Sequence, residues 1–191
     1  KPADKPQISV TEPFKKIRQP YFIQIGFDFG TSYSKCICRD LVTEKAWVHL
    51  PLQSDGQEYP FLMSSVIRHK EGMFTCVDNT GCHYPENGLY HLKQAMVKTA
   101  MKQWDDAVLK PYKSSIGTTE SDKIHNFVES SAVFYLARSL GDVRVQVQRR
   151  MKDFGKLSED YMAVNLAVPV ADAEQPAVNA FYNKVLAEAW Y

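Results

Sequence analysis

The sequence predicts an α/β fold in which helices pack on a mixed β-sheet, made of an antiparallel meander and one parallel strand. Three observations support this prediction. Short segments rich in aromatic and β-branched residues fill the stretch 21–77, amphipathic helical patterns begin near residue 89, and a buried strand pattern at 161–168 directly precedes another helix. Because that late strand returns to the sheet after helices, the crossover into it should be right-handed.

Length and composition indicate one domain with a substantial core. The chain has 191 residues, 45% of them apolar, and a formal net charge of +1. These values disfavour disorder and a general nucleic-acid surface, so no nucleic acid is expected as a partner. The chain has no apolar run of membrane-spanning length and no signal peptide at its start, which predicts a cytoplasmic protein without a membrane partner. Since the sequence starts at Lys1 rather than methionine, removal of a targeting segment stays open.

The first part of the chain is predicted to contain an arm and then strands. Residues 1–20 should form an extended arm, because they contain four prolines and five basic residues without sustained periodicity. The segments 51–60 and 78–88 are rich in turn residues and are expected to be irregular. Short strands are expected in the first half of 21–39, before the turn at 30–33, and at 34–39, 46–50, 61–69 and 73–77.

Two helices are predicted in the middle of the chain. Apolar residues align on one face over 89–104 at the helical period of about 100° per residue. A second apolar stripe covers 121–140, where Ser121 or Asp122 can cap the start and Gly141 is a natural stop or kink.

Other segments complete the helical part. The segment 105–120, with a proline and a glycine, is interpreted as a linker that interrupts the helices. The charged segment 142–154 is interpreted as another helix or an extension of the second one. The strand at 161–168 should end at Pro169, because proline cannot donate to a central ladder.

A final helix is predicted over about 175–190. Asp172 and Gln175 have the spacing of a capping box, and Pro176 suits the first helical turn. The helix reaches Tyr191 with apolar residues still in register and without a glycine cap, which predicts that the natural chain continues.

The stretch 21–39 carries the strongest indication of a binding site. Its two strands are joined by a turn of one glycine and three hydroxyl side chains, Gly30, Thr31, Ser32 and Tyr33, here called the 30–33 turn. Glycine lets the backbone approach a ligand closely, and exposed amides with short hydroxyls suit phosphate oxygens. Asp28 lies just before this turn on an apolar strand, where a lone carboxylate is costly to bury unless a partner such as a metal ion on a polyphosphate is present. The alternative is ordinary turn chemistry, in which Asp28 bonds its own backbone.

Lys93 departs from the pattern of its helix. It falls near the middle of the apolar face of 89–104. One interpretation is that its stem lies along the core while the ammonium reaches water. The other is that the charge is directed at an anion.

The four cysteines, Cys36, Cys38, Cys76 and Cys82, are interpreted as structural. Their spacings match no common zinc module, and free cysteines often behave as small buried apolar residues. A zinc site that includes His83 is the alternative.

Three segments resemble one protein superfamily. The run Asp-Phe-Gly-Thr-Ser-Tyr-Ser at 28–34 resembles the first phosphate motif of the ATPases that include actin, the sugar kinases and the seventy-kilodalton heat-shock chaperones, and its Thr-Ser-Tyr-Ser part is most similar to the chaperones. The Leu-Lys-Gln around Lys93 resembles the place where these chaperones carry a lysine that reaches the terminal phosphate. The strand, Val-Pro and helix of 161–190 resemble the end of the first chaperone lobe, but Val170 replaces the usual alanine, and an aromatic pair and a Gln-Arg are missing.

The resemblance covers roughly residues 21–190 and implies a ribonuclease H-like lobe, the first of two lobes that enclose ATP and Mg²⁺. It implies that Asp28 organises Mg²⁺ through water, that Gly30, Thr31, Ser32 and Tyr33 hold phosphates, and that Lys93 stabilises charge on the transferred group. Residues 21–191 would be the first nucleotide-binding lobe, inactive alone. The full-length parent would be an ATPase whose partners are nucleotide, the second lobe, unfolded peptides and co-chaperones.

Two alternatives stay open. An actin-like filament subunit or a sugar kinase would share the fold and the ATP site. A degenerate lobe that serves as an interaction scaffold would retain the motif only as a turn.

Overall fold

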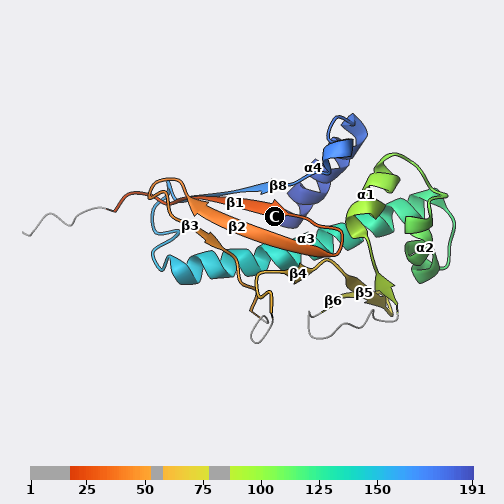
Figure 1. Ribbon diagram of the computed structural model, residues 1–191, viewed down its shortest axis with the longest axis horizontal. Helices are drawn as coiled ribbons and strands as arrows, with labels where there is room; N and C mark the ends of the chain where they lie inside the picture. Colours follow the sequence, from red (N-terminus) through yellow and green to blue (C-terminus); the bar gives the residue numbers. More distant parts are fainter. Residues whose placement is uncertain (1–17, 53–57, 78–86) are drawn as a thin grey trace, which may run out of the picture.

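The computed structural model describes residues 18–52, 58–77 and 87–191. Most of the 1–20 arm, part of the 51–60 loop, most of the 78–88 segment, and Cys82 with His83 therefore lie outside the described residues. Figure 1 shows a twisted sheet with one long helix running along it and the shorter helices gathered at one end. The predicted α/β class with a mixed sheet and flanking helices is confirmed.

The main sheet combines the first hairpin with one late strand. β1 (Phe22–Asp28) pairs antiparallel with β2 (Tyr33–Asp40) and parallel with β8 (Tyr161–Leu166). β3 (Ala46–Val48) and β4 (Met63–Ser64) both pair antiparallel with β2, at different ends of that strand. The resulting strand order is β3-β2-β1-β8, so the predicted position of the parallel strand in this sheet is correct.

The prediction that one antiparallel meander extends from residue 21 to about residue 77 is correct only as far as β4, because the strands after β4 do not join the main sheet. β5 (Ile67–Lys70), β6 (Met73–Cys76) and β7 (Gly88–Leu89) form a separate three-stranded sheet. The β5–β6 turn has positive φ angles at Glu71 (53°) and Gly72 (79°), the geometry that suits tight hairpins. β5 is the central strand of this sheet, because it pairs with β6 on one side and β7 on the other.

The first predicted helix is shorter than its apolar pattern. α1 covers Leu92–Ala100 rather than 89–104. Leu89 belongs to β7, and the chain leaves the helix at Lys102, whose φ is 56°. The supposed linker 105–120 is also partly helical, with η1 (Ala107–Leu109) and α2 (Lys110–Ile116).

The long helix α3 (Ser121–Arg150) passes through the glycine that was expected to stop it. Val143 and Val147, beyond Gly141, are fully buried, so packing on the sheet continues the helix through the glycine. The charged segment after residue 141 is thus an extension of this helix. Ser121 is its first helical residue rather than its cap, and the N-cap, Glu120, makes no side-chain capping hydrogen bond.

The last helix, α4 (Pro176–Trp190), follows the short turn η2 (Val170–Asp172) and agrees closely with the prediction. Pro176 occupies its first turn as expected, but the capping box does not form, because no side chain caps the helix at Gln175. Instead, the amide of Gln175 donates to the carbonyl of Asp172 at 3.0 Å.

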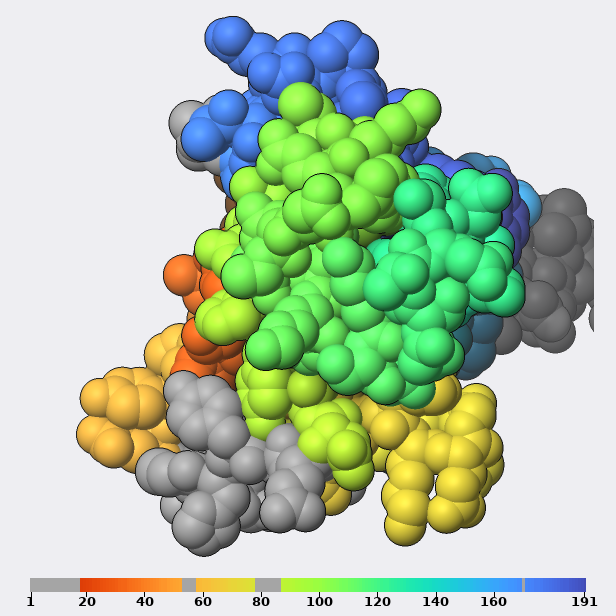
Figure 2. Space-filling view, turned by 90° about the vertical axis from the view of Figure 1, so that its right-hand side faces the viewer, coloured from red at the N-terminus to blue at the C-terminus, as the bar shows by residue number. Residues whose placement is uncertain are grey.

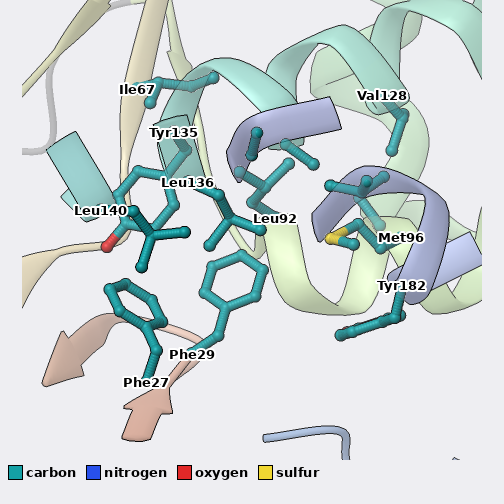
Figure 3. Close-up of a cluster of buried hydrophobic side chains, with 14 of the residues drawn as sticks. Phe27, Phe29, Ile67, Leu92, Met96, Val128, Tyr135, Leu136, Leu140 and Tyr182 are labelled. Atoms are coloured by element: carbon teal, nitrogen blue, oxygen red, sulfur yellow. The ribbon is translucent and has the colours of Figure 1, made fainter. Parts of the chain in front are cut away.

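The core lies between the main sheet and the helices. Alternate residues of β1 point inward and are fully shielded from solvent, and Figure 3 shows Phe27 and Phe29 facing Leu136 and Leu140 of α3. The opposite face of the same strands carries exposed side chains such as Ile37 of β2, which is 50% exposed. Among the described helices, none combines the length and apolar character of a membrane-spanning segment.

Candidate functional site

The 30–33 turn closes very tightly. A Cβ atom at Gly30 would lie 1.9 Å from the carbonyl oxygen of Tyr33, far inside van der Waals contact. Phe29, just before the glycine, is fully buried and stacks on Tyr135 of α3, with ring centroids 5.4 Å apart. The buried Phe29 therefore anchors the start of the turn in the core, while Ser32 and Tyr33 at its tip are exposed.

Asp28 differs from its prediction in one respect. It is the last residue of β1 and its side chain is 49% exposed, because it lies on the outer face of the sheet. Its Oδ2 lies 3.3 Å from Nζ of Lys35, directly across the hairpin. The expectation that Asp28 is buried without a protein partner is therefore wrong. Asp28 is adjacent to the turn as predicted, and its carboxylate remains accessible.

The helix that carries Lys93 starts close to the turn. Figure 3 shows Leu92 facing Phe29, and Figure 2 shows the red-orange surface of the first hairpin beside the lime-green surface where α1 begins. Lys93 is partly buried in the first turn of α1, which has no acidic residue and no side-chain cap. Among the described residues, the Lys93 ammonium has no carboxylate within ion-pair distance. If Lys93 is directed at an anion, we expect its ammonium to point toward the 30–33 turn.

The backbone of Lys93 is also bonded to the last helix, α4. The hydroxyl of Tyr182, on α4, donates to the carbonyl oxygen of Lys93 at 3.1 Å. Tyr182 is buried, and burial raises the pKa of its phenol. This hydrogen bond ties the first turn of α1 to α4.

Ser65 is a site residue that the sequence interpretation missed. Its amide donates to the carbonyl of Ser32 at 2.9 Å, and its hydroxyl lies 2.8 Å from the hydroxyl of Ser34. Both Ser34 and Ser65 are fully buried. The signal in the sequence was the pair of serines within the apolar segment 61–69, which was treated as one continuous strand.

A buried tyrosine completes this cluster of hydroxyls. The Tyr135 hydroxyl is enclosed in the core, and it makes no hydrogen bond within the described part of the chain. Burial raises the pKa of Tyr135, and the neighbouring hydroxyls of Ser34, Ser65 and Ser139 act in the opposite direction. The region under the 30–33 turn is thus polar although it lies inside the core.

Three of the four cysteines lie among the described residues. Cys36 and Cys38 are buried on the inner face of β2, whereas Cys76 is exposed. The hydrogen bond with Cys38, together with burial, raises the pKa of the Cys36 thiol. No cluster of three or more candidate metal ligands occurs among the described residues.

The chain contains a second Asp-Phe-Gly run, at residues 153–155. It lies beyond the end of α3, at the opposite end of the sheet from the 30–33 turn (Figure 1). Its glycine amide donates to Asp160 at 2.8 Å and its phenylalanine stacks on Tyr21. This run therefore belongs to a structural turn.

Comparisons with models of known protein families, with curated proteins and with solved structures each return no match.

Proposed function

We propose that this chain is the first, ribonuclease H-like lobe of a two-lobed ATPase similar to the heat-shock chaperones and actin, and that the 30–33 turn binds phosphate groups. The observation that carries the proposal is the closed geometry at Gly30, where no side chain fits and the exposed tip offers hydroxyls. Such a turn brings backbone amides close to an anion without steric obstruction.

The proposed roles follow from position. Thr31, Ser32 and Tyr33 lie at the tip and supply donors to phosphate oxygens. Asp28 supplies an accessible carboxylate oxygen, a ligand type that suits Mg²⁺ and its water shell. Lys93, in the uncapped first turn of α1, adds positive charge on the side of the turn where Leu92 meets Phe29. When bound, ATP with Mg²⁺ would supply a transferable phosphoryl group. We further propose a cytoplasmic location, which suits this activity.

A non-catalytic scaffold is the second candidate. The observation in its favour is the Asp28–Lys35 pair, which gives the carboxylate a partner without a metal ion. In that case the turn would be a structural hairpin, and its sequence would carry no phosphate affinity.

A titration followed by amide chemical shifts separates the two candidates. We expect magnesium tripolyphosphate, and magnesium ATP, to shift the amides of residues 28–33 at millimolar concentration. Asp28→Asn should weaken the dependence on Mg²⁺, whereas Asp122→Asn, a matched change of an exposed carboxylate on α3, should leave it intact. Shifts that are absent, or scattered over the surface, would favour the scaffold.

The affinity of the isolated chain should be weak. One lobe provides phosphate contacts but no enclosed nucleoside pocket, and enclosure supplies much of the affinity for a small ligand. Calorimetry with ATP at micromolar concentration should therefore detect no binding. Micromolar affinity for this chain would contradict the two-lobe proposal.

A further inference from the structure

We propose that Ser65 is a positioning residue for the 30–33 turn and that it acts together with Ser34; this inference rests on the proposed phosphate-binding role of the turn. Ser65 follows directly after β4, a strand that pairs with the first two residues of β2. It therefore belongs to a different segment of the chain from the turn that it contacts.

Ser65 holds the turn at two points. Its backbone amide donates to the carbonyl of Ser32, inside the turn, and its side chain bonds Ser34, just after the turn. The amide contact fixes the orientation of the peptide at the tip, and peptide orientation decides whether amides point at an anion. The hydroxyl contact fixes the spacing between β4 and β2 at the same level.

The hydroxyl contact is shielded from solvent. Both serines are fully buried, and Tyr135 and Ser139 lie beside them. A buried hydroxyl that loses its partner carries the desolvation cost of that group. The Ser34–Ser65 bond should therefore favour one arrangement of the turn, and removing either hydroxyl should permit others.

Phe29 and Tyr135 extend this support to the long helix. Phe29 precedes the turn and stacks on Tyr135 of α3, which also faces the two serines. The turn is thus supported from β4 and α3 at once, and a site built on such elements is held more precisely than a free loop.

The test compares four forms of the chain in a double-mutant cycle: wild type, Ser65→Ala, Ser34→Ala and both together. The first readout, taken without ligand, is hydrogen exchange at the amide of residue 65, which donates to Ser32 in every variant. We expect exchange at this amide to become roughly tenfold faster in each single variant, relative to core amides of α3, with little further change in the double variant.

Ser131→Ala is the matched control. Ser131 is equally buried, but its hydroxyl donates to the carbonyl of Phe127 within α3 at 2.7 Å. This change should leave exchange at residue 65 unaltered after normalisation to the core amides. Equal acceleration in Ser65→Ala and Ser131→Ala would overturn the inference, because it would show only a general loss of stability.

The second readout is the titration with magnesium tripolyphosphate. We expect Ser65→Ala and Ser34→Ala to weaken the wild-type affinity at least threefold, and Ser131→Ala to preserve it. If wild type binds and Ser65→Ala binds with the same affinity, the positioning role of Ser65 is overturned, whereas the proposed phosphate-binding function is not. Absence of binding by wild type would overturn the proposed function and the positioning role with it.

Discussion

Gly30 has a steric environment that admits only glycine. An alanine Cβ would meet the Tyr33 backbone at 1.9 Å, and backbone cannot move aside as a flexible side chain can. We expect Gly30→Ala to lower the free energy of unfolding by roughly 2–4 kcal/mol through local strain. Urea denaturation measures the change.

Gly141 provides the control for that substitution. A Cβ atom there meets nothing within 4 Å, and the residue lies inside α3. Because alanine has the higher helix propensity, Gly141→Ala should raise the free energy of unfolding by up to about 1 kcal/mol. Similar destabilisation by both substitutions would contradict the steric argument at Gly30.

Asp160 accepts hydrogen bonds from several groups at the start of the described chain and in the loop before β8. Its shielded carboxylate is bonded by Arg18, at 2.8 Å from Nη1, and by the amides of Tyr21, Gly155 and Leu157. The hydrogen bond from Arg18, followed by these amides, holds the pKa of Asp160 well below its usual range. The Arg18–Asp160 ion pair anchors residue 18 to the loop before β8.

This lowered pKa predicts a pH dependence of stability. The stabilising contribution of Asp160 is complete above the unfolded-state pKa of about 3.9 and is lost as pH falls toward the lower folded-state pKa. Asp160→Asn should reduce stability by roughly 2 kcal/mol at neutral pH and flatten the decline below about pH 4. Urea denaturation at several pH values tests this, and an unchanged slope in Asp160→Asn would contradict the argument.

At the scale of elements, the hairpin β1–β2 separates a buried face from an exposed one. Ile25 is fully shielded, whereas Ile37, on the neighbouring strand, is 50% exposed. The alternation of side chains along a strand accounts for this difference between two chemically identical residues.

The two isoleucines therefore give a matched pair of substitutions. Ile25→Ala should lower the free energy of unfolding by about 3 kcal/mol, because it removes buried methyl groups and leaves a cavity. Ile37→Ala should lower it by less than about 1 kcal/mol. Thermal or urea denaturation measures both, and equal losses would show that the outer face is covered in the native protein.

At the scale of the whole molecule, the helices join the candidate site to the rest of the described chain. α1 contacts α3 and α4, and the Tyr182 hydrogen bond to Lys93 links two of these helices at the site. The position of Lys93 is therefore set by the packing of the helical layer and not by α1 alone.

Lys93 leads to a prediction for the proposed two-lobed ATPase. Lys93→Ala should reduce ATP hydrolysis far more than nucleotide affinity, as expected for a contact that strengthens in the transition state. Lys98→Ala is the control on the same helix, because Lys98 already pairs with Asp106 at 3.1 Å. Single-turnover hydrolysis and equilibrium binding separate the two effects; equal loss of both would return Lys93 to a structural role.

Local patterns were sufficient for much of this architecture. The alternation in β1 and β2, the buried strand at 161–168 and the apolar stripe of α4 each identified an element within a few residues of its bounds. The 30–33 turn was also identified from sequence, because glycine between two strands is a local signal. The proposed phosphate role rests on the closed geometry of that turn together with its sequence.

Tertiary packing decided the remaining features. Gly141 did not end α3, because burial of Val143 and Val147 outweighs a glycine penalty of about 1 kcal/mol. Leu89 joined β7 although it continued a helical stripe, and Asp28 gained Lys35 as a partner across the hairpin. Ser65 reached the turn through pairing between segments about thirty residues apart, as its hydrogen bond to Ser34 shows. By itself the sequence determined the elements that have a local period, whereas only the folded structure decided helix ends, sheet membership and long-range hydrogen bonds, because their free energies depend on partners distant in the chain.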